Sequence, residues 1–287
     1  MIKLPNYIKE KYELIDSKKL GSGAFGKVYR IRDKKVFNEF VLKKISKEDT
    51  DKKYFEKEKN FLLKVKGVNI VKLIDYYEDD EDDSYYFVFE KMEGDLNNLL
   101  NKKYKNGMPL EMIKKIFLQL NSAFKIMKNF GITHRDLKPD NILYSYIDSN
   151  KNDFIIKLAD FGLATNLKST KIATLAGTPG YIAPEIFTFK YSDKCDLYSL
   201  GIILYKLKTG EYIFGNSDEE IYNNMKKNNL KKTGDKLLDD LITKIVVFEP
   251  KDRINWDEYF NHPFFKGKIF DLLLDSNQKN INGIIHY

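Results

Sequence analysis

The stretch that decides the fold is HRDLKPDN at residues 134–141, and DFG follows at residues 160–162. It offers Asp136 as a proton acceptor, Lys138 as a neighbouring cation, and Asn141 and Asp160 as oxygen ligands. Moving a phosphoryl group onto a hydroxyl demands positioning and charge neutralisation more than covalent chemistry. A solvated loop would explain any four of these residues alone, but not both motifs in this order. The stretch therefore suits phosphoryl transfer.

The amino-acid composition limits the classes of protein to which this chain can belong. The 287 residues are 43% hydrophobic and 32% charged, which indicates a globular chain with one large domain or two lobes. No apolar run approaches the roughly 18 residues of a membrane segment, and residues 1–7 lack the apolar core of a signal peptide. We therefore expect an intracellular protein, in the cytoplasm or, as the alternative, in the nucleus. A single cysteine, Cys195, excludes an internal disulfide.

The formal net charge of +7 does not by itself indicate a nucleic-acid partner. The lysines are scattered along the chain and mixed with acids, whereas a nucleic-acid surface needs a basic stripe. We expect no specific nucleic acid among the partners.

A glycine-rich segment precedes the central stretch, with the pattern G-x-G-x-x-G at Gly21, Ser22, Gly23, Ala24, Phe25 and Gly26. Glycines let the backbone approach phosphates and donate N–H groups to them. A P-loop is disfavoured because Val28 stands where that motif needs a serine or threonine. A dinucleotide site is disfavoured because the segment continues as β-rich sequence and not as an amphipathic helix. The pattern predicts a hairpin that covers a nucleotide.

Taken together, these motifs resemble those of the eukaryotic protein kinases of the serine/threonine type. An extended turn at residues 145–153 is similar to that of the calcium/calmodulin-dependent kinase group. The resemblance covers roughly residues 12–265 and implies an α+β, two-lobed fold, with a small β-rich N-lobe carrying one main helix and a larger helical C-lobe. In chain order, the implied organisation is a leader at residues 1–11, the N-lobe and hinge at 12–92, the C-lobe at 93–265, and a C-terminal tail at 266–287.

The resemblance assigns roles to the central stretch. Asp136 would accept the proton of the substrate hydroxyl, and Lys138 would steady the transferring phosphate. Asn141 and Asp160 would hold Mg²⁺, and ATP would be the phosphoryl donor.

The resemblance also assigns a lysine–glutamate pair. Lys43 stands on an expected strand at residues 40–45 and would contact the α- and β-phosphates, whereas Lys44 would point to the opposite face. Glu58, on an expected helix at residues 50–65, is the predicted partner of Lys43. Glu56 is the alternative, about 200° round the helix.

The resemblance further implies a set of nucleotide-contacting residues. Phe89 would be the gatekeeper behind the base, and the backbone of Glu90 and Met92 would hydrogen-bond the adenine edge. Asp95 would accept from the ribose hydroxyls or cap the following helix. The remaining expected contacts are Val28, Val41 and Leu143.

Residues 160–185 resemble an activation segment. Thr174 matches a regulatory phosphorylation site, for an upstream kinase or for self-phosphorylation, and Arg135 would pair with its phosphate. Ser169, Thr170 or no site at all are the alternatives. Thr178, in the substrate groove, and Lys138 together favour a serine or threonine acceptor.

Other positions are expected to be structural. Asp196 would clamp the backbone of the catalytic loop, and Arg253 would pair with Glu185. The acidic run at residues 78–83 predicts a solvated hairpin loop. His262 lies far from the motifs and is interpreted as structural.

Substrate preference stays open at this level. Asp95 and Asp140 could receive a basic residue, yet Lys206 stands where arginine-selecting relatives carry an acid. The chain is thus expected to be an ATP-dependent protein serine/threonine kinase. The alternative is a pseudokinase, a nucleotide-binding scaffold without turnover.

Overall fold

The fold was obtained as a computed structural model, which describes residues 4–15, 21–23, 26–151, 153–166, 177–188, 191–215, 218–227 and 230–266. The chain divides into two compact units. The first unit comprises Met1–Glu93 with Leu158–Gly162, and the second comprises Gly94–Lys157 with Leu163–Tyr287. Each is described by itself.

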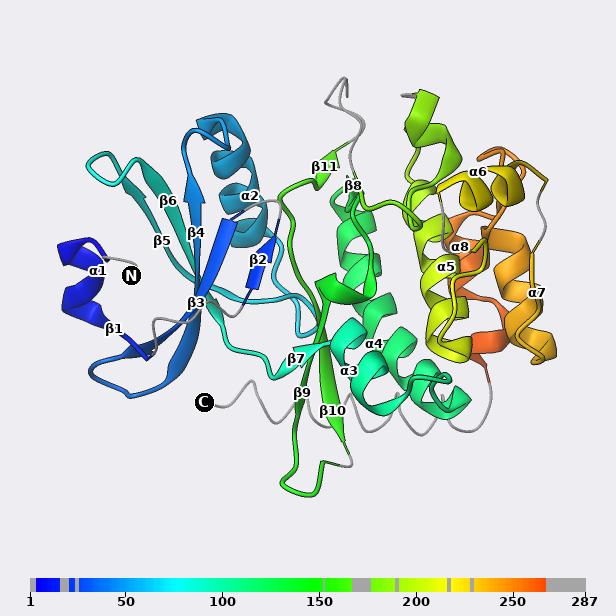
Figure 1. The fold of residues 1–287 in the computed structure, drawn as a ribbon, viewed down its shortest axis with the longest axis horizontal. Helices are drawn as coiled ribbons and strands as arrows, with labels where there is room; N and C mark the ends of the chain where they lie inside the picture. Colours follow the sequence, from blue (N-terminus) through cyan, green and yellow to red (C-terminus); the bar gives the residue numbers. More distant parts are fainter. Residues whose placement is uncertain are drawn as a thin grey trace. The chain divides into compact units, whose positions relative to one another are not determined.

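The first unit is built on a six-stranded sheet (Figure 1). Its order is β1-β3-β4-β6-β5, with β2 pairing against β3. The strands are β1 (Tyr12–Leu14), β2 (Gly21–Gly23), β3 (Gly26–Asp33), β4 (Glu39–Ser46), β5 (Leu73–Asp79) and β6 (Ser84–Glu90). Adjacent strands pair antiparallel, as expected for hairpin connections.

Helices cover both faces of this sheet. Because side chains alternate along a strand, β6 sends Tyr86 and Val88 to one face and Tyr85 and Phe87 to the other. The first face packs against Ile8 of α1 (Asn6–Lys11), and the second packs against α2 (Lys52–Lys64). This double coverage explains why β6 is buried from Ser84 to Val88.

The acidic run at residues 78–83 is a hairpin end, as expected, but it is not fully solvated. Asp79 is 7% exposed and accepts a hydrogen bond from the Tyr7 hydroxyl at 2.7 Å. Asp82 pairs with Lys44 at 2.6 Å. Two of these acids therefore connect the hairpin end to α1 and to β4.

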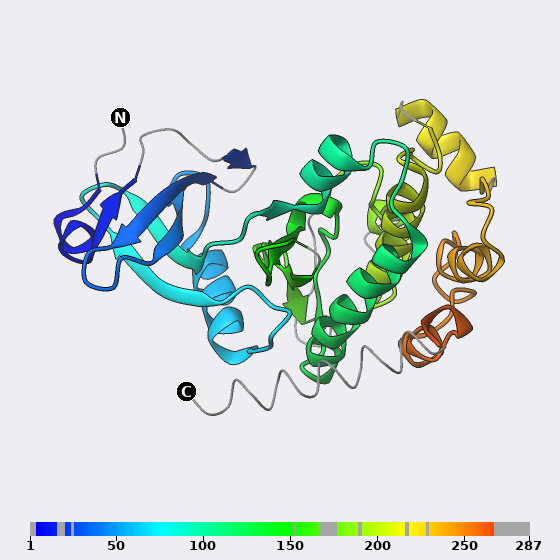
Figure 2. The same ribbon diagram turned by 90° about the horizontal axis from the view of Figure 1, so that it is seen from below.

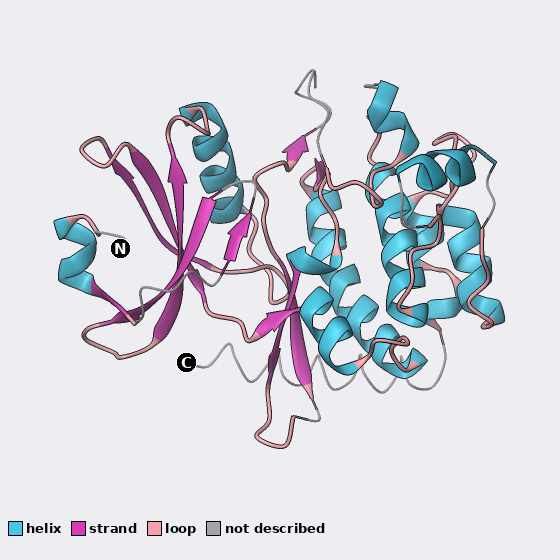
Figure 3. Cartoon of the chain, in the orientation of Figure 1, coloured by secondary structure: helices cyan, strands magenta, loops and turns pink. Residues whose placement is uncertain are grey.

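The second unit is mainly helical (Figure 3). Its α-helices are α3 (Leu96–Lys103), α4 (Leu110–Asn129), α5 (Cys195–Thr209), α6 (Asp218–Lys227), α7 (Lys236–Ile245) and α8 (Trp256–Phe260). Short 3-10 helices are η1 (Pro139–Asn141), η2 (Pro184–Thr188) and η3 (Pro263–Phe265). The strands form two small sheets: β10 (Phe154–Leu158), β9 (Ile142–Tyr146) and β7 (Gly94–Asp95) in one, and β11 (Thr165–Asn166) and β8 (Ile132–Thr133) in the other.

Helix α5 is the core of this unit. It is buried continuously from Cys195 to Leu207, as is expected for a helix that carries apolar residues on every side. It packs closely on α7 (Figure 2), because Gly201 has no side chain: a Cβ there would lie 2.2 Å from Val246. The helix ends at Gly210, whose φ of 79° forms a left-handed cap.

The turn expected over residues 145–153 is shorter than predicted, because β9 runs on through Tyr146. The aromatic side chains of Tyr144 and Tyr146 contact each other edge to face, which favours the extended backbone at these positions. Among the described residues, none of the helices combines the length and apolar character needed to cross a membrane.

Candidate active site

Lys43 is the charged centre of the first unit. Its Nζ lies 2.8 Å from Oδ1 of Asp160 and 3.6 Å from Oε1 of Glu58. Burial acts to lower the pKa of Lys43, but the two carboxylates outweigh burial and raise that pKa above its ordinary value. Burial raises the pKa of Glu58, against the opposing effect of Lys43. Lys43 therefore stays a cation.

The neighbouring residues Lys44 and Glu56 point away from the Lys43–Glu58 pair, as strand and helix geometry require. Lys44 pairs with Asp82, and Glu56 pairs with Lys59. Neither neighbour takes part in the Lys43 cluster.

The DFG stretch folds into this unit although it is remote in sequence. Phe161 is buried, and its ring lies 4.6 Å from that of Phe61 in α2. Asp160 has a positive φ of 60°, which is uncommon for a residue other than glycine and turns the chain sharply. A Cβ at Gly162 would come 3.4 Å from Oε2 of Glu58. Packing of Phe161 thus brings the Asp160 carboxylate to Lys43.

The glycine-rich segment forms the β2–β3 hairpin. Gly21, Ser22 and Gly23 make up β2, and Gly26 begins β3 with a φ of 131°. A Cβ at Gly26 would lie 2.4 Å from the Lys44 carbonyl oxygen, so the close approach requires glycine. The expected contacts Ala24 and Phe25 lie outside the described residues.

The pairing of β3, β4 and β6 places three apolar residues that were expected to contact the nucleotide near Lys43. Val28 pairs with Lys43 across β3 and β4, and Val41 pairs with Phe89 across β4 and β6. The Phe89 ring also packs 5.7 Å from that of Phe87.

The expected hinge residues have structural contacts of their own. The Glu90 carboxylate accepts from the Lys72 backbone N–H at 2.7 Å. Asp95 caps α3 by accepting from the Asn98 backbone N–H at 2.8 Å, which is the second of its two expected roles. Leu143 pairs with Asp95 in the β7–β9 ladder. Met92 lies between β6 and β7.

In the second unit, Asp136 is the centre of a hydrogen-bonded cluster. Its Oδ1 accepts from the Thr178 hydroxyl at 2.7 Å, and its Oδ2 lies 3.1 Å from Nζ of Lys138. The Lys138 ammonium also donates to the Thr178 hydroxyl at 2.8 Å. Asn141, in η1, donates to the Asp136 backbone carbonyl at 2.8 Å and to Oδ2 at 3.1 Å. The carboxylate is only 5% exposed, so its orientation is fixed.

Asp196 holds the backbone of this loop. Its carboxylate accepts from the backbone N–H groups of His134 at 2.7 Å and Arg135 at 3.0 Å. Burial raises the pKa of Asp196, against the lowering effect of these hydrogen bonds. Arg135 has a φ of 72°, a strained conformation that the clamp supports. The expected backbone contact of Asp196 is thus present.

Of the expected pair of Arg135 and phosphorylated Thr174, the structure describes Arg135. The Arg135 guanidinium lies 4.5 Å from the centre of the Tyr191 ring and donates to the Leu163 carbonyl at 3.4 Å. Thr174, Ser169 and Thr170 lie outside the described residues.

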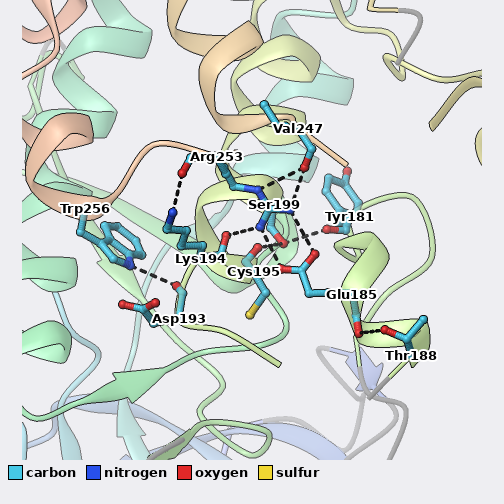
Figure 4. A network of polar contacts seen from close by, with 10 residues as sticks. All are labelled: Tyr181, Glu185, Thr188, Asp193, Lys194, Cys195, Ser199, Val247, Arg253 and Trp256. Carbon is cyan, nitrogen blue, oxygen red and sulfur yellow. Dashed lines mark hydrogen bonds and ion pairs between the residues drawn. The ribbon is translucent and has the colours of Figure 1, made fainter. Parts of the chain in front are cut away.

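A polar network at the N-terminal end of α5 supports the segment that carries Thr178 (Figure 4). Arg253 forms a bidentate pair with Glu185 at 2.9 and 3.0 Å and also donates to the Val247 carbonyl at 2.8 Å. Ser199 donates to the Tyr181 carbonyl at 2.7 Å. This second contact was missed from the sequence, although a serine within a mainly apolar helix indicates a buried hydroxyl that needs a partner.

Two further expectations concern single residues. Cys195 is a buried free thiol, and burial raises its pKa. His262 caps η3, because its Nδ1 accepts from the Phe264 backbone N–H at 3.2 Å, while Nε2 lies 2.9 Å from Asp240. Its position is structural, as expected.

The donor chemistry fits magnesium. Mg²⁺ prefers oxygen ligands and is held by one or two carboxylates together with substrate phosphates. Asp160, in the first unit, carries a carboxylate, and Asn141, in the second, carries an amide oxygen, so each has the oxygen donor that Mg²⁺ prefers. Within the described ranges, no group of three or more His, Cys, Asp or Glu side chains has the geometry of an all-protein metal site.

Comparison with known proteins identifies the family. The family model of the protein kinase domain matches residues 14–265. The chain therefore belongs to the protein kinase family, whose members generally use ATP and Mg²⁺.

Similar proteins include kinases from three different organisms. Calcium-dependent protein kinase 4 of Plasmodium falciparum is 35% identical over 274 residues, which cover 90% of this chain and 50% of that protein. Serine/threonine-protein kinase ATG1c of Arabidopsis thaliana is 35% identical over 264 residues, covering 88% and 35% respectively. A probable serine/threonine-protein kinase, fhkB of Dictyostelium discoideum, is 33% identical over 265 residues, covering 86% and 22%. The chain thus spans half or less of the length of these relatives.

Proposed function

We propose that this chain is a protein serine/threonine kinase that uses Mg²⁺ and transfers the γ-phosphoryl group of ATP to a serine or threonine hydroxyl of a protein. One observation carries the proposal: a threonine hydroxyl, that of Thr178, donates to the Asp136 carboxylate at 2.7 Å. A general base needs a hydroxyl at about 2.6–3.2 Å. Asp136 thus already holds an alcohol in the geometry that an acceptor residue requires.

The other residues of the second unit would assist this step. Asp136 would take the proton of the incoming hydroxyl, and Asn141 would fix the carboxylate by its two hydrogen bonds. Lys138 shares its ammonium between Asp136 and Thr178. In turnover, it would neutralise charge on the transferring phosphoryl group.

The first unit would supply the charge that orients the nucleotide. Lys43 would bind the α- and β-phosphates, and Glu58 would hold its ammonium in place. Asp160 and Asn141 would hold Mg²⁺, which when bound neutralises phosphate charge. We assign Val28, Val41, Phe89 and Leu143 to the apolar walls around the base.

The glycine-rich hairpin and the hinge would complete the nucleotide contacts. The backbone of residues 21–26 would cover the phosphates. The backbone of Glu90 and Met92 would hydrogen-bond the adenine edge. Asp95 would act as a helix cap and accept from the ribose.

We also propose regulation by phosphorylation of Thr174. A phosphothreonine carries about −1.5 to −2 charges and pairs well with arginine, for which Arg135 is the candidate. Peptide mapping after incubation with ATP should find phosphate on Thr174, and Thr174→Ala should lower activity. Full activity of that variant would exclude this control.

Two assays test the function. ATP with Mg²⁺ should raise the thermal unfolding midpoint, because a ligand that binds only the folded state stabilises it. Radiolabelled phosphate should then appear on serine and threonine of a generic basic protein. If ATP and Mg²⁺ raise the unfolding midpoint but the purified protein transfers no phosphate, the alternative is favoured, a nucleotide-binding scaffold without turnover.

A further inference from the structure

The turn between β3 and β4 presents two neighbouring apolar side chains to solvent. Val36 is 60% exposed and Phe37 is 70% exposed. The whole turn from Lys34 to Asn38 is exposed, so neither side chain belongs to the core of the first unit. A single exposed apolar residue is ordinary in a folded protein. Here, however, the exposure coincides with an unfavourable backbone conformation.

The backbone of Phe37 is strained. Its φ is 58°, in the left-handed region that glycine and asparagine favour and that a bulky side chain seldom adopts. The other non-glycine residues with positive φ that the structure describes are all charged: Asp83, Arg135, Lys151 and Asp160. Strain of this kind gathers at functional positions. Because the Phe37 side chain is exposed, packing in the core does not compensate the strain.

Hydrogen bonds fix the turn in this conformation. The buried Asp33 carboxylate accepts from the backbone N–H groups of Lys35 at 2.8 Å and Val36 at 3.0 Å. The backbone N–H of Phe37 donates to the Asp33 carbonyl at 2.9 Å, and that of Asp33 donates to the Asn38 carbonyl at 3.0 Å. The two apolar side chains are therefore presented on a preformed turn, so that binding through them costs little ordering.

Lysines flank the apolar pair. The turn lies beside the end of α1 (Figure 1), where the Lys34 backbone N–H donates to the Lys11 carbonyl at 3.0 Å and the Lys34 ammonium donates to the Lys9 carbonyl. Among the described residues, no carboxylate forms an ion pair with Lys9, Lys34 or Lys35. Glu10, on α1, is the exposed acid next to them. Positive charge is therefore in excess around the turn.

We propose that this turn inserts Val36 and Phe37 into the interface of a bilayer that contains anionic lipids, while Lys9, Lys34 and Lys35 contact the lipid headgroups. Aromatic rings favour the membrane–water interface, and anionic lipids attract lysines close to the surface. A small protruding apolar tip enters a fluid lipid interface, whereas a stable protein interface needs a larger complementary surface. The attachment is reversible, because so small a tip is not a permanent anchor.

The turn is remote from the Lys43 cluster within the first unit. Val28, which pairs with Lys43, stands on β3 five residues before Asp33, or about 17 Å at roughly 3.3 Å per residue. Attachment to a membrane through the turn therefore goes beyond the proposed kinase function and does not depend on it.

Sedimentation of the intact chain with sucrose-loaded vesicles tests the proposal. Vesicles of phosphatidylcholine alone are compared with vesicles of equal parts phosphatidylcholine and phosphatidylserine. Wild type should bind the anionic vesicles at least about ten-fold more tightly, because each lysine near such a surface adds to the attraction. This binding should weaken as salt is added, since salt screens exposed charges.

Two substitutions of Phe37 separate insertion from simple charge attraction. Phe37→Gly removes the ring and tolerates the positive φ, so it should bind anionic vesicles about ten-fold more weakly. Its unfolding midpoint should be no lower than that of wild type. Phe37→Trp should keep the binding, and anionic vesicles should shift its fluorescence to shorter wavelength. Wild type provides the reference for this shift, because Trp256 is its single tryptophan.

Further variants test the lysines and provide a control. The double variant Lys34→Gln, Lys35→Gln should lose most of the preference for anionic vesicles. Ile147→Ser removes a 62% exposed apolar side chain from the turn after β9, in the second unit, and should bind as wild type does.

Four results would overturn the inference. Wild type could bind neither kind of vesicle at low salt. Phe37→Gly could bind anionic vesicles as tightly as wild type, which would assign the binding to scattered lysines. A marked fall in the unfolding midpoint of Phe37→Gly would show that the ring serves folding. Binding of soluble polyglutamate that depends on Phe37, without binding of vesicles, would assign the turn to an acidic protein partner.

Discussion

Glu185→Gln tests how strongly the buried ion pair supports the second unit. The carboxylate of Glu185 is 3% exposed, and the guanidinium of Arg253 is fully buried. Glutamine keeps the shape and one acceptor oxygen but removes the negative charge. The arginine is then left as a buried charge without its counter-ion.

The magnitude follows from this burial. Breaking a buried pair by removing one partner typically costs about 3–5 kcal/mol of unfolding free energy. Because Arg253 keeps hydrogen bonds to the Val247 and Lys194 carbonyls, the lower end applies. A unit of this size loses roughly 2–4 °C per kcal/mol, so the unfolding midpoint should fall by about 6–12 °C.

Thermal unfolding followed by far-UV circular dichroism measures this change. The matched control is Lys244→Met, which removes an exposed pair with Asp240 in which each side chain is 45% exposed. Such a pair typically contributes about 0.3–0.5 kcal/mol. If Glu185→Gln lowered the midpoint no more than this control, the reasoning about the buried pair would be wrong.

Three further predictions concern other parts of the chain. Lys43→Met should abolish phosphate transfer, while Lys44→Met, on the opposite strand face, should keep most of it; equal losses would contradict the proposed role of Lys43. Gly201→Ala should lower the unfolding midpoint, because its Cβ would lie 2.2 Å from Val246 and overpacking typically costs about 1–3 kcal/mol; an unchanged midpoint would show that the contact relaxes. Burial lowers the pKa of His262 more than Asp240 raises it, so the unfolded state binds more protons. Wild type should therefore lose stability relative to His262→Asn as pH falls below about 6.5, and parallel stability curves would contradict this.

The sequence predicted those parts of the site that depend on local geometry. The resemblance to protein kinases selected Lys43 and Glu58, while strand alternation and helix rotation directed Lys44 and Glu56 to other faces. Both choices agree with the contacts that the structure shows. The orientation of Lys44 and Glu56 follows from periods of 2 and 3.6 residues, whereas the choice of Lys43 and Glu58 rested on the resemblance.

Contacts between residues remote in sequence could not be predicted in the same way. The burial of Asp79 depends on the Tyr7 hydroxyl, which α1 brings across the sheet. The environment of Lys206 depends on two tyrosines from separate loops. From the sequence alone, a charged residue at such a position is expected to be exposed to solvent. The sequence does not show which aromatic or polar groups the fold will bring there.

In the proposed reaction, Asp136 accepts the proton of a serine or threonine hydroxyl. Asp136→Asn keeps the shape of the side chain but removes its basicity, and general-base assistance is typically worth about 10²- to 10⁴-fold.

The most direct measurement compares the rate of phosphate transfer by wild type and Asp136→Asn at saturating ATP, Mg²⁺ and substrate protein. We expect the variant to lose about 10²- to 10⁴-fold in kcat while keeping the midpoint shift that ATP and Mg²⁺ produce. Transfer at the wild-type rate by a folded variant that binds nucleotide would contradict the account.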